Sequence, residues 1–150
     1  MIKKYRKKAS KKLKETLNRY CISKRKERRL WRRQYSTVCV GVENYEQNIQ
    51  VCSYSYDHTY NKKYVFPECL KQKLSKLGTI GVTVLKGRRC VLGFCAEPHA
   101  AKELIEKLDR KGWNKRMGYL VFTKALKIRT GQVVDYCLFC KKTFKQLDTI

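Results

Sequence analysis

Acidic residues are scarce in this chain, which has 12 Asp and Glu against 36 Lys and Arg in 150 residues and a formal net charge of +24. That excess is far larger than solubility requires, so it predicts a polyanionic partner. Long apolar runs are missing as well, and without a run of about 18 apolar residues we expect no membrane span. The first residues lack the apolar stretch of a signal peptide, so we expect an unsecreted protein in a reducing intracellular compartment: cytoplasm, nucleus or virion.

The sequence is also poor in the residues that build catalytic sites. It has two histidines and eight glycines, and neither a Gly-rich phosphate loop nor a nucleophile elbow is found. His58 lies next to Asp57 and His99 lies near Glu97, but the other acids are scattered. A metal-dependent nuclease needs several carboxylates in one cleft, and Glu97 is more simply the start of a helix. We therefore expect a non-catalytic protein, with a nuclease as the less favoured alternative.

The positive charge is concentrated in residues 1–34, which hold sixteen Lys and Arg against two Glu, a net charge of +14. Apolar residues recur there at steps of three and four, which predicts a helix with one narrow apolar stripe; they are Ile2, Tyr5, Ala9, Leu13, Leu17 and Tyr20. We expect a basic helical arm over 1–34 that orders on a partner, followed by a domain over 35–150. A solvated basic tail and a helix lying on an anionic membrane surface remain alternatives.

From residue 37 onward the pattern changes to short β-branched and aromatic runs separated by amphipathic helices. The order predicts two β-β-α units, 37–78 and 79–112. Strands are expected at 37–42, 48–55, 79–85 and 88–94, and helices at 66–78 and 97–112. A final hairpin, 117–128 and 132–139, and a short tail follow. Hairpins separated by helices indicate an α+β fold, an antiparallel sheet with helices on one face.

A sheet covered on one face leaves the other open, and basic and aromatic side chains fall on the strands and loops that would form it. Basic groups neutralise phosphates and aromatic rings stack on unpaired bases, so we expect nucleic-acid binding. The alternative for each tyrosine is packing under a loop. The candidate nucleic-acid-binding residues are Lys7, Lys8, Lys11, Lys12, Arg25, Lys26, Arg28, Arg29, Trp31, Arg32, Arg33, Tyr60, Lys62, Lys63, Arg88, Arg89, Lys127 and Arg129.

The stretch "GRRCVLGFCAEPHAAKELIEKL" resembles, in layout, the last strands and helix of small sheet-plus-helix DNA-binding domains, such as integrase arm-binding and plant ethylene-response domains. In those domains the sheet enters a groove of the DNA. The resemblance covers about a seventh of the chain and carries no individual residues over.

Eight cysteines are many for a chain without an export signal, so we expect free thiols or metal ligands. Cys137 and Cys140, followed by Phe144, resemble the first half of a two-cysteine, two-histidine zinc finger. No histidines follow before residue 150, so zinc would need ligands from elsewhere. Cys90 and Cys95 are the candidates if the final strand lies beside the second hairpin.

Two other interpretations of these cysteines stay open. They are small apolar residues in strands, or a redox pair, which is less favoured because Cys137 falls in a predicted strand and not at a helix start.

Taken together, the sequence predicts a small, non-catalytic, nucleic-acid-binding α+β protein, with zinc as a possible cofactor. It would be a component of a ribonucleoprotein or virion, or alternatively a sequence-preferring DNA-binding regulator or accessory factor. The residues do not distinguish RNA from DNA.

Overall fold

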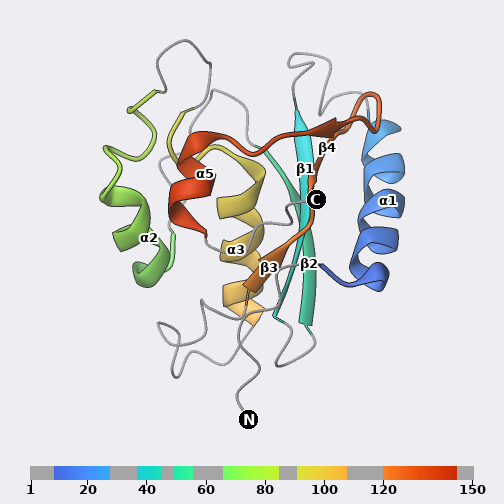
Figure 1. Cartoon of the computed structure of the whole chain (residues 1–150), viewed down its shortest axis with the longest axis horizontal. Helices are drawn as coiled ribbons and strands as arrows, with labels where there is room; N and C mark the ends of the chain where they lie inside the picture. The colour runs from blue at the N-terminus through green and yellow to red at the C-terminus, as the bar shows by residue number, and fades with distance from the viewer. Residues whose placement is uncertain are drawn as a thin grey trace.

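The computed structural model describes residues 9–27, 37–44, 49–55, 66–84, 91–107 and 120–144. These residues form, in chain order, helix α1 (Lys11–Arg25), strands β1 (Val38–Asn44) and β2 (Ile49–Tyr54), helices α2 (Glu68–Ser75) and α3 (Ala96–Lys107), strands β3 (Leu120–Phe122), β4 (Ala125–Lys127) and β5 (Val133–Val134), and helix α5 (Leu138–Thr143) (Figure 1).

The strands form one antiparallel sheet with β1 at its centre. Its order is β2-β1-β4-β5, and β3 also pairs with β1. The predicted first hairpin is present as β1 and β2, with Val42 opposite Val51. The α+β class, with an N-terminal helix before an antiparallel sheet, is confirmed.

Helix α1 packs against one face of this sheet. Ser10 caps the helix, because its side-chain oxygen accepts a hydrogen bond from the Leu13 amide at 3.2 Å. Gly41 of β1 allows a close approach, since a Cβ there would lie 3.0 Å from Leu13 Cδ1. The helix also buries residues in a cluster with the central strands: Leu17, Cys21, Cys39, Leu126 and Ile128.

Helix α3 covers the opposite face, where Val40 and Val42 pack with Ala101 and Leu104 in the main core. Helices α2 and α5 contribute to the same core through Leu70, Leu74, Phe139 and Cys140. Figure 1 shows α1 on one side of the strands and α2, α3 and α5 on the other. Helices therefore lie on both faces rather than on one, because the apolar stripe of α1 packs on the face that we expected to be open.

In its described parts, residues 79–84 and 91–94, the predicted second hairpin is largely replaced by turns; residues 85–90 lie outside the described part. Within the described residues its only ladder contact is an isolated antiparallel bridge between Val84 and Val91. The amides of Val82 and Thr83 both donate to the Thr79 carbonyl, which curls this segment instead of extending it. Gly81 has φ +82°, a conformation that favours glycine and departs from a strand.

The predicted final hairpin also differs. The run 117–128 contains β3 and β4, separated at Thr123 and Lys124, and residues 132–139 contain only the two-residue β5 before the chain enters α5. Buried and exposed side chains alternate there with a helical period, because Phe139, Cys140 and Thr143 are buried while Lys141 and Lys142 are exposed. The helices predicted at 66–78 and 97–112 are present as α2 and α3, and residues 108–112 lie outside the described part.

Candidate metal centre and basic surface

The C-x-x-C pair lies at the start of a helix. Cys137 is the residue before α5 and Cys140 is in its first turn, with the two Sγ atoms 3.6 Å apart. Both side chains are buried thiols. The expectation that the motif does not begin a helix is therefore corrected, because residues 138–143 pack as a helix and not as a strand.

A third cysteine joins this pair from a distant part of the chain. Cys95, immediately before α3, places its Sγ 3.2 Å from Cys137 Sγ. The sulfur atoms of Cys95, Cys137 and Cys140 all lie within 4.8 Å of one another, so these three residues form a group that could hold a metal ion. Cys90, the fourth cysteine predicted for this site, lies outside the described residues. We call these three cysteines the thiol group.

A buried carboxylate borders the thiol group. The Cys140 thiol donates a hydrogen bond to Glu97 Oε2 at 3.3 Å, and Glu97 is only 3% exposed. Burial raises the pKa of Glu97 to about 7. Among the described residues, no Lys, Arg or His nitrogen forms an ion pair with this carboxylate. Sequence reasoning treated Glu97 as a helix start, and the sequence offered no signal that it would face Cys140.

The thiols influence one another's ionisation. Contacts with Cys140 and Cys95 lower the pKa of the Cys137 thiol, whereas the contact with Cys137 raises that of Cys140. Three sulfur atoms gathered at one place are suited to bind a soft cation.

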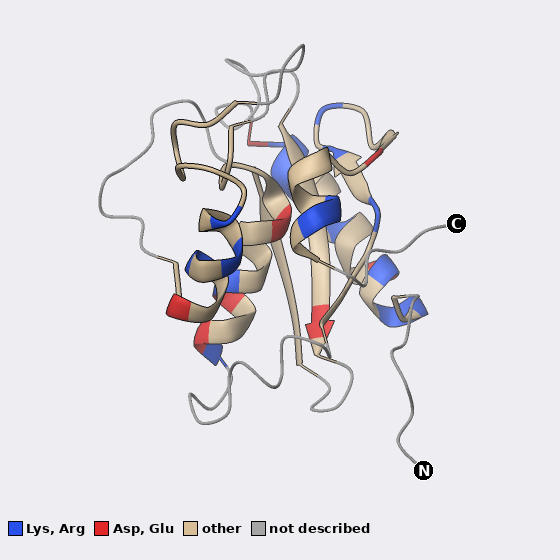
Figure 2. Cartoon of the chain, turned by 60° about the vertical axis from the view of Figure 1, so that its left-hand side comes forward, with Lys and Arg blue, Asp and Glu red and all other residues tan. Residues whose placement is uncertain are grey.

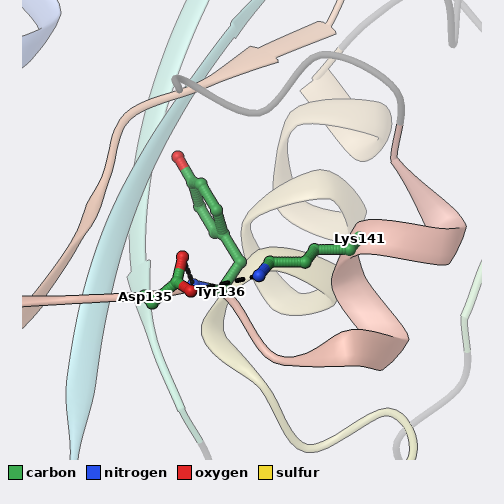
Figure 3. A network of polar contacts seen from close by, with 3 residues as sticks. All are labelled: Asp135, Tyr136 and Lys141. Atoms are coloured by element: carbon green, nitrogen blue, oxygen red, sulfur yellow. Dashed lines mark hydrogen bonds and ion pairs between the residues drawn. The ribbon is translucent and has the colours of Figure 1, made fainter. Parts of the chain in front are cut away.

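The backbone around the C-x-x-C turn is fixed by three residues that Figure 3 shows together. Asp135 accepts a hydrogen bond from the Tyr136 amide at 2.9 Å and pairs with Lys141 Nζ at 3.0 Å, so one carboxylate joins both sides of the turn. The Tyr136 hydroxyl, buried, donates to the Thr123 carbonyl at 2.6 Å, which ties the turn to the segment between β3 and β4. Cys137 and Cys140 are therefore held on a braced loop.

His99, the histidine that the structure describes, does not belong to the thiol group. His99 is buried and its ring packs against Phe66 with a centroid distance of 6.0 Å, and burial lowers its pKa to about 3. His58 lies outside the described residues. His99 lies two residues after Glu97 and therefore on a different side of α3.

Six of the eighteen predicted nucleic-acid-binding residues are described, and they lie on α1 and at the end of β4. Lys11, Lys12, Lys26 and Arg129 are exposed, while Arg25 and Lys127 are half-buried. The others lie outside the described residues: Lys7, Lys8, Arg28, Arg29, Trp31, Arg32, Arg33, Tyr60, Lys62, Lys63, Arg88 and Arg89.

The structure brings two of these basic segments together across about a hundred residues of sequence. Arg25 Nε donates to the Ile128 carbonyl at 2.8 Å, and the Cys21 thiol lies 3.6 Å from the Lys127 carbonyl oxygen. These contacts place the C-terminal end of α1 beside the turn after β4. We call the resulting patch the α1–β4 basic surface; it consists of Arg25, Lys26, Lys127 and Arg129.

Aromatic residues lie at the same end of α1, although sequence reasoning did not group them. Lys24 Nζ lies 5.5 Å from the centroid of the Tyr20 ring and 5.8 Å from that of Tyr54, and it also pairs with Glu27 at 3.1 Å. Burial raises the pKa of Tyr20. Tyr54 belongs to β2 and its ring is on the α1 side of the sheet, because it packs with the cluster of Leu17 and Cys39.

The expected open sheet face is absent from the described part, because α1 covers it. Figure 2 shows Lys and Arg on helices at both sides of the sheet. Within the described residues, the positive charge is thus carried mainly by helix surfaces and strand ends. Among the described residues no helix is long and apolar enough to cross a membrane.

A scan of protein-family models and searches of curated proteins and of solved structures find no match to this chain, so its function is inferred from geometry.

Proposed function

We propose that the protein is a non-catalytic nucleic-acid-binding protein that contacts phosphates through the α1–β4 basic surface and the outer side of α1. The observation that carries this proposal is the junction of Arg25 with the Ile128 carbonyl, which joins the two basic segments in the folded chain. The segment from Lys127 to Val134 contributes two basic residues and no acid. Positive groups gathered in this way favour a polyanion.

The outer side of α1 extends this surface. Lys11, Lys12 and Arg19 are exposed on the helix, and the only acid within Lys11–Arg25 is Glu15. A 15-residue helix is roughly 22 Å long, enough to follow several phosphates of one strand. Stacking of bases on the tyrosines, including Tyr60, remains part of the proposal.

Two alternative biological settings are proposed. A subunit of a ribonucleoprotein or virion, in a reducing compartment, agrees with an electrostatic mode of binding that is largely independent of sequence. A sequence-preferring DNA-binding regulator is the alternative, and it should show a discrete site preference and dimerise. Competition by polymers of different sequence separates the two.

Fluorescence anisotropy of the purified, nuclease-treated chain tests the proposal against single-stranded and duplex RNA and DNA at several NaCl concentrations. The variant Lys26→Gln/Arg129→Gln should weaken binding and reduce the slope of log affinity against log salt by about 1.4 to 1.8. Lys71→Gln/Lys76→Gln, on α2 and at its C-terminal cap, removes the same charge from exposed residues elsewhere and should change the slope less. Equal slopes for both variants, or weak binding of the wild type to all four polymers, would contradict the proposed surface.

We also propose that zinc is the ion held by the thiol group. Three sulfur ligands at two helix starts, Cys137 and Cys140 buried and Cys95 partly buried, favour a soft, tetrahedral ion in a structural role. Tetrahedral zinc with Zn–S bonds of about 2.3 Å separates its sulfurs by roughly 3.8 Å. The sulfur of Cys137 lies 3.2 Å from that of Cys95 and 3.6 Å from that of Cys140, so small movements suffice. Metal analysis of the full chain should find one zinc per chain.

A further inference from the structure

The thiol group supplies three ligands, and structural zinc sites almost always have four. The fourth position must come from an atom close to the three sulfurs. Among the described residues outside the thiol group, Glu97 places Oε2 3.3 Å from Cys140 Sγ. Its oxygens do not lie within 4.8 Å of all three sulfurs, so the side chain must move toward Cys95 and Cys137 to complete the site.

The burial of Glu97 is a second reason to consider its carboxylate as a ligand. Glu97 is 3% exposed, and within the described part no basic side chain pairs with it. A buried carboxylate without a cation is costly, and a bound metal ion would remove that cost. Three thiolates and one carboxylate carry the same total charge as four thiolates, so the charge of an all-cysteine zinc site is reproduced.

His99 does not fit the fourth position. It lies two residues after Glu97, about 200° around helix α3. Its ring packs against Phe66 instead, with a centroid distance of 6.0 Å.

We propose that Glu97 is the fourth ligand of a zinc site formed with Cys95, Cys137 and Cys140. This inference rests on the proposal that the thiol group binds zinc. Cys95 and Glu97 come from the start of α3, and Cys137 and Cys140 from the start of α5, so the ion joins these two helices across the main core. Its role is structural, and the site takes a divalent, thiophilic cation.

The test loads the full-length chain with Zn²⁺, or with Co²⁺ as a spectroscopic probe, under reducing conditions. X-ray absorption at the zinc edge counts sulfur and oxygen ligands, and a competing chelator measures affinity. Wild type should show three sulfurs and one oxygen. Changes in outer-shell partners already cost roughly 10–100-fold in affinity, so Glu97→Gln should weaken Zn²⁺ binding at least about tenfold.

Two further variants keep the outcome interpretable. Glu97→Cys should bind zinc with four sulfurs and intensify the sulfur-to-cobalt absorption, which applies even if Glu97→Gln folds poorly. Glu103→Gln, an exposed carboxylate on the same helix, should leave both coordination and affinity unchanged.

The possible failures are distinct. Zinc bound by four sulfurs, or by three sulfurs and a nitrogen, in the wild type would overturn the assignment of Glu97 and leave the zinc proposal standing. Equal affinity of wild type and Glu97→Gln would do the same. If neither the wild type nor Glu97→Cys retains zinc or cobalt, the zinc proposal itself fails.

Discussion

Ser10 connects helix α1 to strand β1 through one side chain and one amide. Its hydroxyl accepts from the Leu13 amide at 3.2 Å and donates to Glu43 Oε2 at 2.8 Å, while its own amide donates to Glu43 Oε1 at 2.8 Å. Gln50 of β2 donates to the same carboxylate at 3.1 Å. Glu43 is 2% exposed, so these donors satisfy a charge that is removed from water.

Replacing Ser10 with Ala should lower the free energy of unfolding by about 1 to 2 kcal/mol, because both the helix cap and a charge-assisted hydrogen bond are lost. Urea denaturation followed by circular dichroism measures this change. Ser23→Ala, an exposed serine on the same helix, is the control and should stay within about 0.5 kcal/mol of the wild type. If the two variants lose the same amount, the Ser10–Glu43 contact contributes nothing specific.

Helix α1 belongs to the folded domain, and this changes how its role in binding must be tested. Leu13, Leu17 and Cys21 are buried against the sheet. Deleting residues 1–34 would expose Cys39, Leu126 and Ile128 of the smaller core cluster, so weaker binding by the truncated chain would not distinguish lost phosphate contacts from lost structure. Substitutions on the outer side of the helix avoid that ambiguity.

The close contact between α1 and β1 makes Gly41 and Leu13 a coupled pair. A methyl group at Gly41 would lie 3.0 Å from Leu13 Cδ1 and 3.2 Å from Thr123 Cγ2. Gly41→Ala should therefore cost about 1 to 3 kcal/mol through overpacking, and Leu13→Ala about 2 to 5 kcal/mol through a cavity. The double variant should cost less than the sum by at least about 0.5 kcal/mol, since each change relieves the other. Strict additivity of the three unfolding free energies would show that the two positions do not compete for space.

Helices and strands marked by local sequence patterns could be predicted. Those that depend on contacts between residues far apart in the sequence could not. Helix α3 could be predicted because Pro98 lies near its start and its apolar stripe is regular. Helix α5 could not, because a short apolar run fits a strand or a helix equally well. The hydrogen bond from the Tyr136 hydroxyl to the Thr123 carbonyl forms only in the folded chain, so the sequence pattern does not indicate it. The cysteine pattern indicated Cys95, Cys137 and Cys140 as candidate metal ligands, whereas the approach of Glu97 to Cys140 depends on topology.

The whole molecule carries a formal charge of +24, which acts on its stability as well as on its partners. Like charges on one compact body repel, and salt screens that repulsion within a Debye length of about 10 Å at 0.1 M. Three ion pairs among the described residues, Lys24–Glu27, Lys102–Glu106 and Lys141–Asp135, offset only a small part of it.

The melting temperature of the free chain should therefore rise as NaCl increases from about 20 to 300 mM, while affinity for nucleic acid falls over the same range. Differential scanning fluorimetry in NaCl, and not in sulfate, isolates screening from the general strengthening of apolar burial by kosmotropic salts. The Lys71→Gln/Lys76→Gln variant, with less charge, should show a smaller rise. A melting temperature that falls with NaCl would mean that attractive ion pairs outweigh the repulsion.

Because α1 packs against the turn after β4, this helix cannot reach its folded environment until that turn has been translated. Cys21 and the Lys127 carbonyl are 106 positions apart, and Cys95 and Cys137 are 42 apart. Helix α1 thus acquires part of its packing partner on the sheet only after about a hundred further residues have been translated, and Cys137 and Cys140 follow later still. Until then the nascent chain presents an apolar stripe beside dense positive charge, which favours misassociation during that interval.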